Sequence, residues 1–264
     1  MARNGLVGSA YRRQQILGLV NERGDTLVSE LKALFGVSEV TVRSDLAELA
    51  RRGLVVRTHG GAASPAGGLR ALELTFATRD QSNVELKTRI GSAAAALIQN
   101  GQSVMLDAST TGLQLARALR RQPPLQDVTV ITNGVHTALE LVNTPGVNTI
   151  LTGGQLRATA VSLTGALAAD LLGKVHASLG FFGAKGLTLG QGLTDVNLQE
   201  VEMKATMAAV CERVVAIVDH TKLGAVSLAT FVTLRGIALV ITDDGADPAI
   251  VADLEHAGVE VRLV

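Results

Sequence analysis

The feature that most constrains the fold is the alternation, from residue 86 to the C-terminus, of short apolar runs with longer amphipathic segments. Short apolar runs are typical of buried strands, and the segments between them have the period of helices. Strands are expected at residues 103–106, 128–131, 149–151, 179–182, 214–218, 237–241 and 259–263. Helices are expected at residues 86–98, 112–120, 136–141, 165–172, 198–210 and 248–256. This order predicts an α/β domain with a mainly parallel sheet flanked by helices.

Polar and glycine residues follow most of these expected strands. In open parallel sheets, ligands bind just outside the carboxyl ends of the strands. We therefore expect a binding site at this edge of the sheet. The residues that follow strands there include Asp107, Asn133, Gly153, Gly154, Gly183, Lys185, Gly186, Asp219 and Lys222.

The segment Ser109, Thr110, Thr111 and Gly112 joins an expected strand to an expected helix. Hydroxyl groups and unpaired backbone N–H groups converge at such a helix N-terminus, which favours an anion such as phosphate. Asp107 would repel a phosphate but can accept hydrogen bonds from sugar hydroxyls, so we expect it beside the anion. The alternative is an N-cap loop that binds no ligand.

Four further charged residues are candidates for the same site. Lys185 and Lys222 can add positive charge at its rim, because compact ammonium groups suit phosphate, although Lys185 fits a solvated loop equally well. Glu200 and Lys204 lie one turn apart on an expected helix. They form either a simple i,i+4 ion pair or part of the pocket lining.

The first sixty residues predict a different structure. Helices are expected at residues 10–23, 30–35 and 39 to 51 or 52, followed by a β-prone segment at 54–57 and a tight turn at His59, Gly60 and Gly61. Ser29 and Ser38 are expected N-caps, and Leu34 is expected to face inward. Three helices followed by a β-wing are the order of a winged helix-turn-helix.

The third expected helix has two distinct faces. Val42, Leu46 and Leu49 share one side at 100° per residue, which leaves the opposite side free to contact another molecule. The N-terminal end of a recognition helix meets base edges in the major groove, and nearby cations neutralise phosphates. The alternative for each residue is a solvated surface position. The candidate DNA contacts are Ser38, Val40, Thr41, Arg43, Ser44, Arg51, Arg57 and His59.

Composition narrows the class of protein. Hydrophobic residues make up 47% of the 264-residue chain and aromatic residues only 2%, so Ala, Val, Leu and Ile must build the core. A single cysteine and the lack of a signal-peptide or membrane-span pattern favour the cytoplasm. Residues 1–60 hold nine Lys or Arg against six Asp or Glu, which permits a nucleic-acid face there. No metal-ligand or cofactor motif is present in the sequence.

The stretch FGVSEVTVRSDLAELARRGLVVRTHGGA at 35–62 resembles the recognition helix and wing of the DeoR family of transcriptional regulators. Members typically read VSxxT[IV]RRDL, then LxxxG, then RxHGGA. The resemblance continues through DASTT at 107–111, ITN at 131–133, LTGG at 151–154, GAKG at 183–186, EVEMK at 200–204 and DHTKLG at 219–224. One departure is Ser44, which stands where the family commonly has the second arginine of RRDL.

The resemblance implies a winged helix-turn-helix joined to a sensor domain similar in fold to ribose phosphate isomerases. It implies a homo-oligomer, dimer or tetramer, that binds double-stranded operator DNA and no membrane. It also implies a repressor of a carbohydrate operon, relieved by a phosphorylated sugar or polyol. We expect the DNA-binding domain at 1–62, a linker at 63–78 with a hinge at 60–70, and the sensor domain at 79–264.

The main alternative is a sugar-phosphate isomerase, since Asp107, Lys185, Glu200 and Lys204 have the chemistry for acid-base catalysis. A DNA-binding domain would be superfluous in such an enzyme. The sequence also has no P-loop, no GxSxG and no HExxH.

Overall fold

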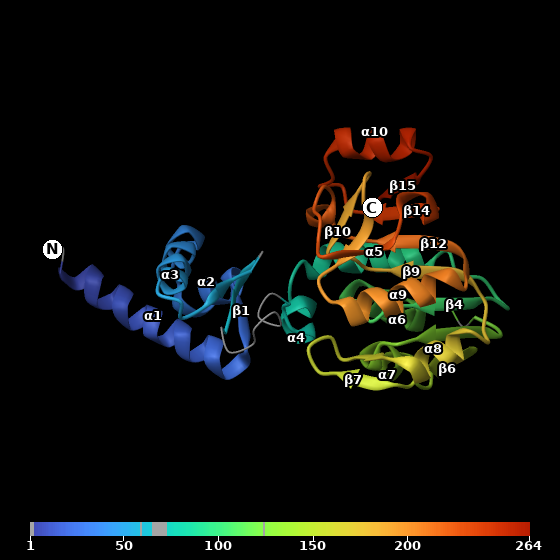
Figure 1. Cartoon of the computed structure of the whole chain (residues 1–264), viewed down its shortest axis with the longest axis horizontal. Helices are drawn as coiled ribbons and strands as arrows, with labels where there is room; N and C mark the ends of the chain where they lie inside the picture. The colour runs from blue at the N-terminus through green and yellow to red at the C-terminus, as the bar shows by residue number, and fades with distance from the viewer. Residues whose placement is uncertain (1–2, 59, 65–72, 124) are drawn as a thin grey trace. The chain divides into compact units, whose positions relative to one another are not determined.

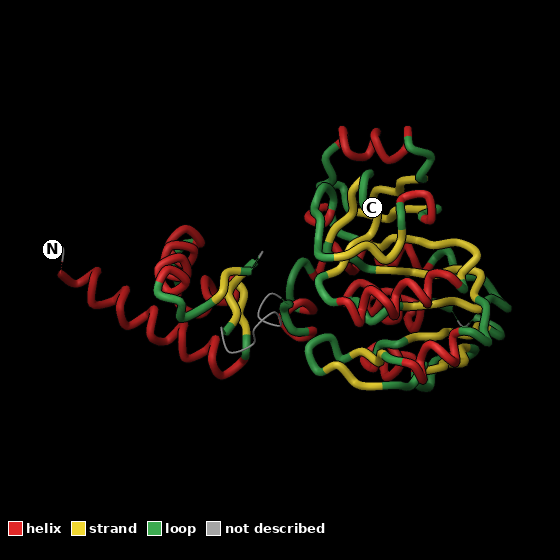
Figure 2. Tube along the Cα trace, viewed as in Figure 1, coloured by secondary structure: helices red, strands yellow, loops and turns green. Residues whose placement is uncertain are grey.

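The computed structural model describes residues 3–58, 60–64, 73–123 and 125–264, which form two compact units. The first unit ends at Ser82 and the second runs from Asn83 to Val264. Helices and strands alternate through most of the second unit (Figure 1, Figure 2).

The first unit is a winged helix-turn-helix, as predicted. Its helices are α1 (Arg3–Arg23), α2 (Val28–Phe35) and α3 (Glu39–Arg51), and its strands are β1 (Asp25–Leu27), β2 (Val56–Arg57) and β3 (Gly61–Ala63). The strands form an antiparallel sheet in the order β1-β3-β2. Its core includes Ile16 and Val20 from α1, Leu31 from α2 and the predicted stripe Val42, Leu46 and Leu49 of α3.

Three expectations for this unit were wrong. The second helix begins at Val28, so Ser29 lies inside it and Leu27 takes the N-cap position. Leu34 is exposed, because α2 turns only its Leu31 side toward the core. Gly61 belongs to strand β3 and not to a hinge, since a Cβ atom there would lie 1.8 Å from the carbonyl oxygen of Thr26 on the neighbouring strand.

A short helix missing from the prediction, α4 (Phe76–Asp80), belongs to the first unit and contacts β1. The carboxylate of Asp25, buried in β1, accepts hydrogen bonds from the Thr75 amide and the Thr78 hydroxyl, each at 2.6 Å. The first compact unit therefore extends to Ser82 and includes α4. We had expected a linker at residues 63–78, which would have separated α4 from the winged helix.

We expect Asp25→Ala to release α4 from the winged helix. A hydrogen bond to a charged group contributes about 1.5 to 3 kcal/mol, so the amides of residues 76–80 should exchange with solvent about thirtyfold faster. Hydrogen-exchange mass spectrometry on the full chain measures this rate. Asp25→Asn, which keeps one acceptor oxygen, should have a smaller effect, and unchanged exchange in Asp25→Ala would contradict this anchoring role.

The second unit is built on a seven-stranded parallel sheet, as predicted. The order of its strands is β15-β14-β12-β9-β4-β5-β6, from the top to the bottom of the unit in Figure 1. All seven expected strands are present, with ends shifted by up to three residues. Their bounds are β4 (Ser103–Leu106), β5 (Val128–Thr132), β6 (Val147–Leu151), β9 (Ala177–Phe182), β12 (Cys211–Ile217), β14 (Leu239–Thr242) and β15 (Glu260–Leu263).

Helices cover both faces of this sheet. One hydrophobic cluster joins Val104 and Leu106 to Ile90, Leu115 and Leu141 of three helices, and the other joins Met105 to helices on the opposite face. Alternate side chains of β4 thus enter different clusters, which is the period of a strand buried on both sides. The helices on the face of Val104 and Leu106 are α5 (Val84–Ala95), α6 (Thr110–Arg121) and α7 (Val135–Leu141). The helices on the face of Met105 are α8 (Ala166–Leu172), α9 (Leu198–Ala209) and α10 (Pro248–His256).

Two small antiparallel sheets, not predicted, complete the second unit. One has the order β10-β11-β13 and the other pairs β7 with β8. A 3-10 helix, η2 (His220–Lys222), follows β12, and another, η3 (Leu234–Gly236), precedes β14. The strands of the two small sheets are β7 (Gln155–Arg157), β8 (Ser162–Thr164), β10 (Gly186–Thr188), β11 (Gly192–Asp195) and β13 (Ala229–Val232).

None of the helices in the described part of the chain is both long and apolar enough to cross a membrane.

Candidate functional site

The N-terminal end of α3 presents the polar and apolar groups expected of a recognition helix. The Ser38 hydroxyl caps the helix by accepting a hydrogen bond from the Thr41 amide at 3.2 Å, and it contacts the Thr41 hydroxyl at 2.8 Å. Val40 is 77% exposed, and Ser44 is also exposed. Since the buried stripe anchors the other side of α3, this face is available to another molecule.

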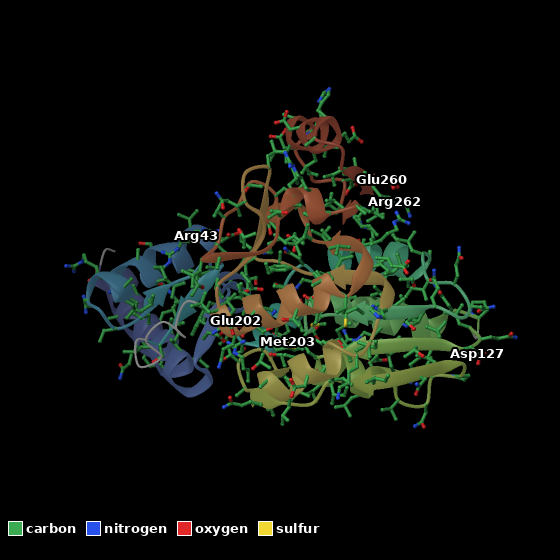
Figure 3. All side chains as sticks on the ribbon, turned by 45° about the vertical axis from the view of Figure 1, so that its right-hand side comes forward. Arg43, Asp127, Glu202, Met203, Glu260 and Arg262 are labelled. Carbon is green, nitrogen blue, oxygen red and sulfur yellow. The ribbon has the colours of Figure 1, made fainter. Side chains whose placement is uncertain are left out.

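Arg43 projects from this face (Figure 3) and pairs with Glu39 one turn earlier, at 2.7 Å. The hydrogen bond from Arg43 holds the pKa of Glu39 below its usual value. Arg57 of the wing donates to the backbone carbonyl oxygen of Arg43 at 3.2 Å, so it lies against α3. Arg51 pairs with Glu48 on the exposed surface, and His59 lies outside the described residues.

Asp45, for which no role was predicted, fixes α3 against α1. Its carboxylate is buried and accepts hydrogen bonds from Arg12 at 2.5 Å and Arg13 at 3.2 Å. The signal was available, because Asp45 lies on the same side of the helix as Val42 and Leu49. Two arginines thereby orient the candidate recognition helix without being part of its exposed face.

In the second unit, the expected effector residues gather beyond the carboxyl ends of neighbouring strands. Asp107 follows β4, Asn133 follows β5, Gly183 follows β9 and Asp219 lies two residues beyond β12. Because β12, β9, β4 and β5 are adjacent and parallel, these four residues lie at one edge of the sheet. Lys222 ends η2 after Asp219, while Gly153 and Gly154 lie beyond β6.

The centre of this edge is a buried ion cluster of Asp107, Lys204 and Asp195. The Lys204 ammonium lies 3.1 Å from the Asp107 carboxylate and 2.8 Å from the Asp195 carboxylate, and it donates to the Gly183 carbonyl oxygen at 2.9 Å. It also lies 5.0 Å from the centre of the Phe231 ring. Lys204 therefore binds strand ends together and does not pair simply with Glu200.

Burial and charge act in opposite directions on this cluster. Burial alone would lower the pKa of Lys204, but Asp195 and Asp107 outweigh it and raise that pKa above its ordinary value. Burial likewise works to raise the pKa of Asp195, yet the Lys204 ammonium and then Lys185 bring it below its ordinary value. The Lys204 ammonium and the Asp195 carboxylate, held charged in this way, form a fixed scaffold, unlike a general base whose pKa lies near neutrality.

Glu200, the other member of the expected i,i+4 pair, has its own partners. Its carboxylate lies 2.6 Å from the guanidinium of Arg157 and accepts a short hydrogen bond from Ser162. All three side chains are nearly buried. Arg157 and Ser162 stand at the facing ends of β7 and β8, so Glu200 fastens this hairpin to α9. Sequence reasoning missed both partners, because neither follows a strand of the main sheet.

Ser109 and Gly183 show how closely the strand ends approach. The Ser109 hydroxyl accepts from the Gly112 amide at 2.9 Å and so caps α6, while Asp107 accepts from the amides of Ser109 and Gly183. A Cβ atom on Gly183 would lie 2.5 Å from the Ser109 side chain, which explains the need for glycine. Thr110 and Thr111 are the first two residues of α6, and their amides have no partner within the helix.

The remaining expected residues lie around this centre. The Asn133 amide nitrogen donates to the Leu163 carbonyl oxygen, but its buried Oδ1 atom has no hydrogen-bond partner. Asp219 accepts from the Thr221 amide and hydroxyl, and thus caps η2. Lys222 is half-buried at the end of η2. Lys185 directly precedes β10, and Gly186 is the first residue of that strand. No cluster of His, Cys, Asp and Glu with the arrangement of a metal site occurs in the described part of the chain.

Comparison with known protein families decides what kind of protein this is. A DeoR-like helix-turn-helix domain matches residues 12–66, and a DeoR C terminal sensor domain matches residues 82–244. The chain belongs to the DeoR family. These matches cover both units, so the family assignment rests on the sensor domain as well as on the helix-turn-helix.

Curated DeoR-family relatives resemble the chain over almost its whole length. It is 38% identical to the HTH-type transcriptional regulator GolR of Listeria innocua, over 96% of this chain and 97% of the relative. It is 34% identical to a putative aga operon transcriptional repressor of Escherichia coli O157:H7, over 98% of this chain and 95% of the relative. This DeoR-family chain is therefore a transcriptional regulator, and the isomerase alternative is not favoured.

Among solved structures, ribose 5-phosphate isomerase A of Methanocaldococcus jannaschii matches 54% of this chain and 55% of its own. The sequence identity is 18% and the TM-score is 0.40. Likeness at this level says nothing about activity.

Proposed function

We propose that this DeoR-family protein represses an operon of carbohydrate metabolism and that a phosphorylated sugar or polyol controls it. In this proposal α3 and the wing bind double-stranded operator DNA, in the cytoplasm. The observation that carries it is the surface formed by Val40, Arg43 and Ser44 of α3 with Arg57 of the wing against it. The end of a recognition helix can contact base edges in the major groove, and a cation of the wing on the same face can contact the flanking phosphates.

The base contact is assigned to Arg43 and the phosphate contact to Arg57. The ion pair of Arg43 with Glu39 is exposed, and exposed pairs contribute little free energy, so a guanine can replace Glu39 at small cost. Ser38 and Thr41 lie at the N-terminal end of α3, and we assign their hydroxyl groups to phosphate contacts. Val40 is suited to contact with a thymine methyl group.

We expect Arg43→Ala to cost about 1 to 3 kcal/mol of binding to the preferred DNA sequence and little on random DNA. Arg57→Ala should instead weaken binding to both kinds of DNA. It should also reduce the slope of log affinity against log salt concentration by about one. The measurement is fluorescence anisotropy on a duplex selected by the full chain from a random pool, with a scrambled duplex as control. Equal losses on both duplexes from Arg43→Ala would reassign Arg43 to a phosphate.

The effector site is assigned to the carboxyl edge around Thr110 and Thr111. Lys204 and Arg157 are already paired with Asp107, Asp195 and Glu200, so they add little net positive charge. The phosphate is therefore assigned to the N-terminus of α6, where unpaired amides and the helix dipole favour an anion. Lys185 and Lys222 supply further positive charge, and Asn133 and Glu200 are assigned to the sugar hydroxyls.

Calorimetric titration of the full chain with matched pairs of compounds tests this site. Suitable pairs are ribose 5-phosphate with ribose, fructose 6-phosphate with fructose, and glycerol 3-phosphate with glycerol. At least one phosphorylated compound should bind a hundredfold more tightly than its partner, which corresponds to about 2.7 kcal/mol, and should change operator affinity. Tight binding of a free sugar with no binding of any phosphorylated form would overturn the assignment.

A further inference from the structure

The two edges of the seven-stranded sheet differ in how they are protected from other chains. Strand β15 ends the sheet on one side and carries Glu260 and Arg262, whose ion pair measures 3.3 Å (Figure 3). Strand β6 ends it on the other side with the uncharged sequence VNTIL. Charged side chains on an edge strand discourage pairing with a second sheet, so β15 is protected and β6 is not.

The backbone of β6 has a hydrogen-bonding side that faces away from the sheet. The Gly146 carbonyl oxygen accepts from the Val128 amide, and the Thr152 amide donates to the Thr132 carbonyl oxygen, each at 3.0 Å. Residues of even number therefore bond to β5, and the alternation of a ladder turns the N–H and C=O groups of Thr149 and Leu151 outward. Within the described residues, β6 pairs with β5 alone.

Helix α7 carries an apolar stripe beside this edge. Glu140 faces α6, because its carboxylate lies 2.9 Å from Arg120 and 3.8 Å from Arg117. At 100° per residue, Leu139 points about 100° away from Glu140 around the helix axis. Val142 is the C-cap residue that directly follows Leu141, the last residue of α7. Leu139 is 65% exposed and Val142 is 55% exposed. Side chains of this size are normally buried, and α7 also contacts β6.

The segment that carries β6 and α7 is also poor in charge. Between residues 128 and 156 the sequence has no Asp, Lys or Arg and one Glu, Glu140, which is paired with the arginines of α6; the one histidine is His136 of α7. A two-fold contact brings each residue near its own copy, so any charge close to the axis would meet a like charge. The low charge of this segment leaves little like-charge repulsion between two copies, and cores of interfaces show the same depletion.

We propose that β6 and α7 form a two-fold interface with a second copy of this chain. The two β6 strands pair in antiparallel orientation with Thr149 opposite Thr149, and Leu151 opposite Val147 of the second copy. This register follows from the backbone groups that face away from β5. Only the odd-numbered residues of β6 turn both their N–H and their C=O group toward the second copy. Leu139 of α7 and its C-cap residue Val142 then cover their counterparts in the second copy along the same axis, on the face that also holds Val147.

The interface has a direct consequence for DNA recognition. One chain has one candidate recognition helix, whereas operators read by helix-turn-helix proteins consist of two half-sites. A pair joined through β6 supplies two such helices on one particle. Binding at the second half-site then becomes intramolecular, which raises the overall affinity.

The first test changes the charge of the α7 stripe in the full chain. By sedimentation velocity, the double variant Leu139→Glu and Val142→Glu should be a monomer where the unchanged chain is a dimer, and should have half as many chains where it is a larger even oligomer. A partner variant with Lys at both positions should dissociate in the same way, and an equimolar mixture of the two should restore the full association. The control is Leu263→Glu on the exposed edge of β15, which should leave the oligomer intact.

The second test does not depend on how the glutamate variants fold. In a hydrogen-bonded antiparallel pair the two Cα atoms are about 5.5 Å apart, which suits a disulfide. Thr149→Cys should therefore form a covalent dimer when oxygen and copper phenanthroline oxidise the two thiols, whereas Leu263→Cys should not. An unchanged chain that is monomeric, glutamate variants that stay associated, or Thr149→Cys that fails to crosslink would each overturn the interface.

Discussion

Lys204→Met is expected to lower the free energy of unfolding of the sensor domain by about 3 to 5 kcal/mol, the largest stability effect among the single substitutions considered. The substitution leaves Asp107 and Asp195 buried without their shared cation, and an unpaired buried charge costs far more than an exposed one. Methionine has nearly the shape of lysine, so the loss arises from the charge and not from a cavity.

Urea unfolding followed by circular dichroism measures this loss, and hydrogen exchange at β4 and β9 assigns it to the sensor domain. The control is Glu202→Met, which changes an exposed residue of the same helix and should shift the free energy by less than about 0.5 kcal/mol. Adding Asp195→Asn to Lys204→Met should recover part of the loss. If Lys204→Met were as stable as its control, the cluster would not hold the strand ends together.

The pH dependence of the same experiment has a defined sign. Because the pKa of Asp195 in the folded chain lies below its ordinary value of 3.8, its contribution is complete above that value and disappears as the pH falls through the folded pKa. The pKa of Lys204 is raised above 10.5, so its contribution is complete below that value and disappears only at higher pH. Lys204→Met should therefore remove stability at neutral pH and flatten its acid dependence.

Thr110→Glu is expected to abolish the response to a phosphorylated effector, with at least a hundredfold loss of effector affinity. The new carboxylate would stand at the first residue of α6, where the phosphate is proposed to bind, and like charges repel. A negative charge at a helix N-terminus is favourable in itself, so the helix should persist.

The matched control for this change is Thr110→Gln, which has the size of glutamate without its charge. Titration calorimetry with the phosphorylated compound that binds the unchanged chain best, together with anisotropy on the selected duplex, measures both activities. Thr110→Glu should still bind DNA but no longer respond, while Thr110→Gln should retain more of the response. Equal effector affinity in the two variants would place the phosphate elsewhere.

The local pattern was sufficient to predict the main strands and helices of the sensor domain, but not its two small antiparallel sheets. Each apolar run became a strand of one parallel sheet, because a strand buried on both faces needs nearly continuous apolar sequence. The pattern also predicted that Asp107 and Gly183 lie beyond strand ends. It could not pair Asp107 with Lys204 on α9, since contacts between residues so far apart depend on which strands are neighbours in the sheet.

In the winged helix, too, local pattern predicted some features and contacts between distant segments decided others. The stripe of Val42, Leu46 and Leu49 was predicted correctly, because the period of a helix alone decides which side chains share a face. The burial of Leu34 was predicted wrongly, because α2 is short and only its contacts with α1 and α3 decide which side is covered. Strand β1 is three residues long and carries no detectable period.

The sequence by itself determined the two fold types, the order of their main helices and strands, the DeoR resemblance and the end of each main strand where polar residues collect. Only the tertiary structure decided the strand order, the partners of Lys204 and Glu200, the attachment of α4 to Asp25 and the unprotected edge at β6. The reason is physical: periodicity and capping act over a few residues, whereas ion pairs, edges and docked helices arise when distant segments pack together.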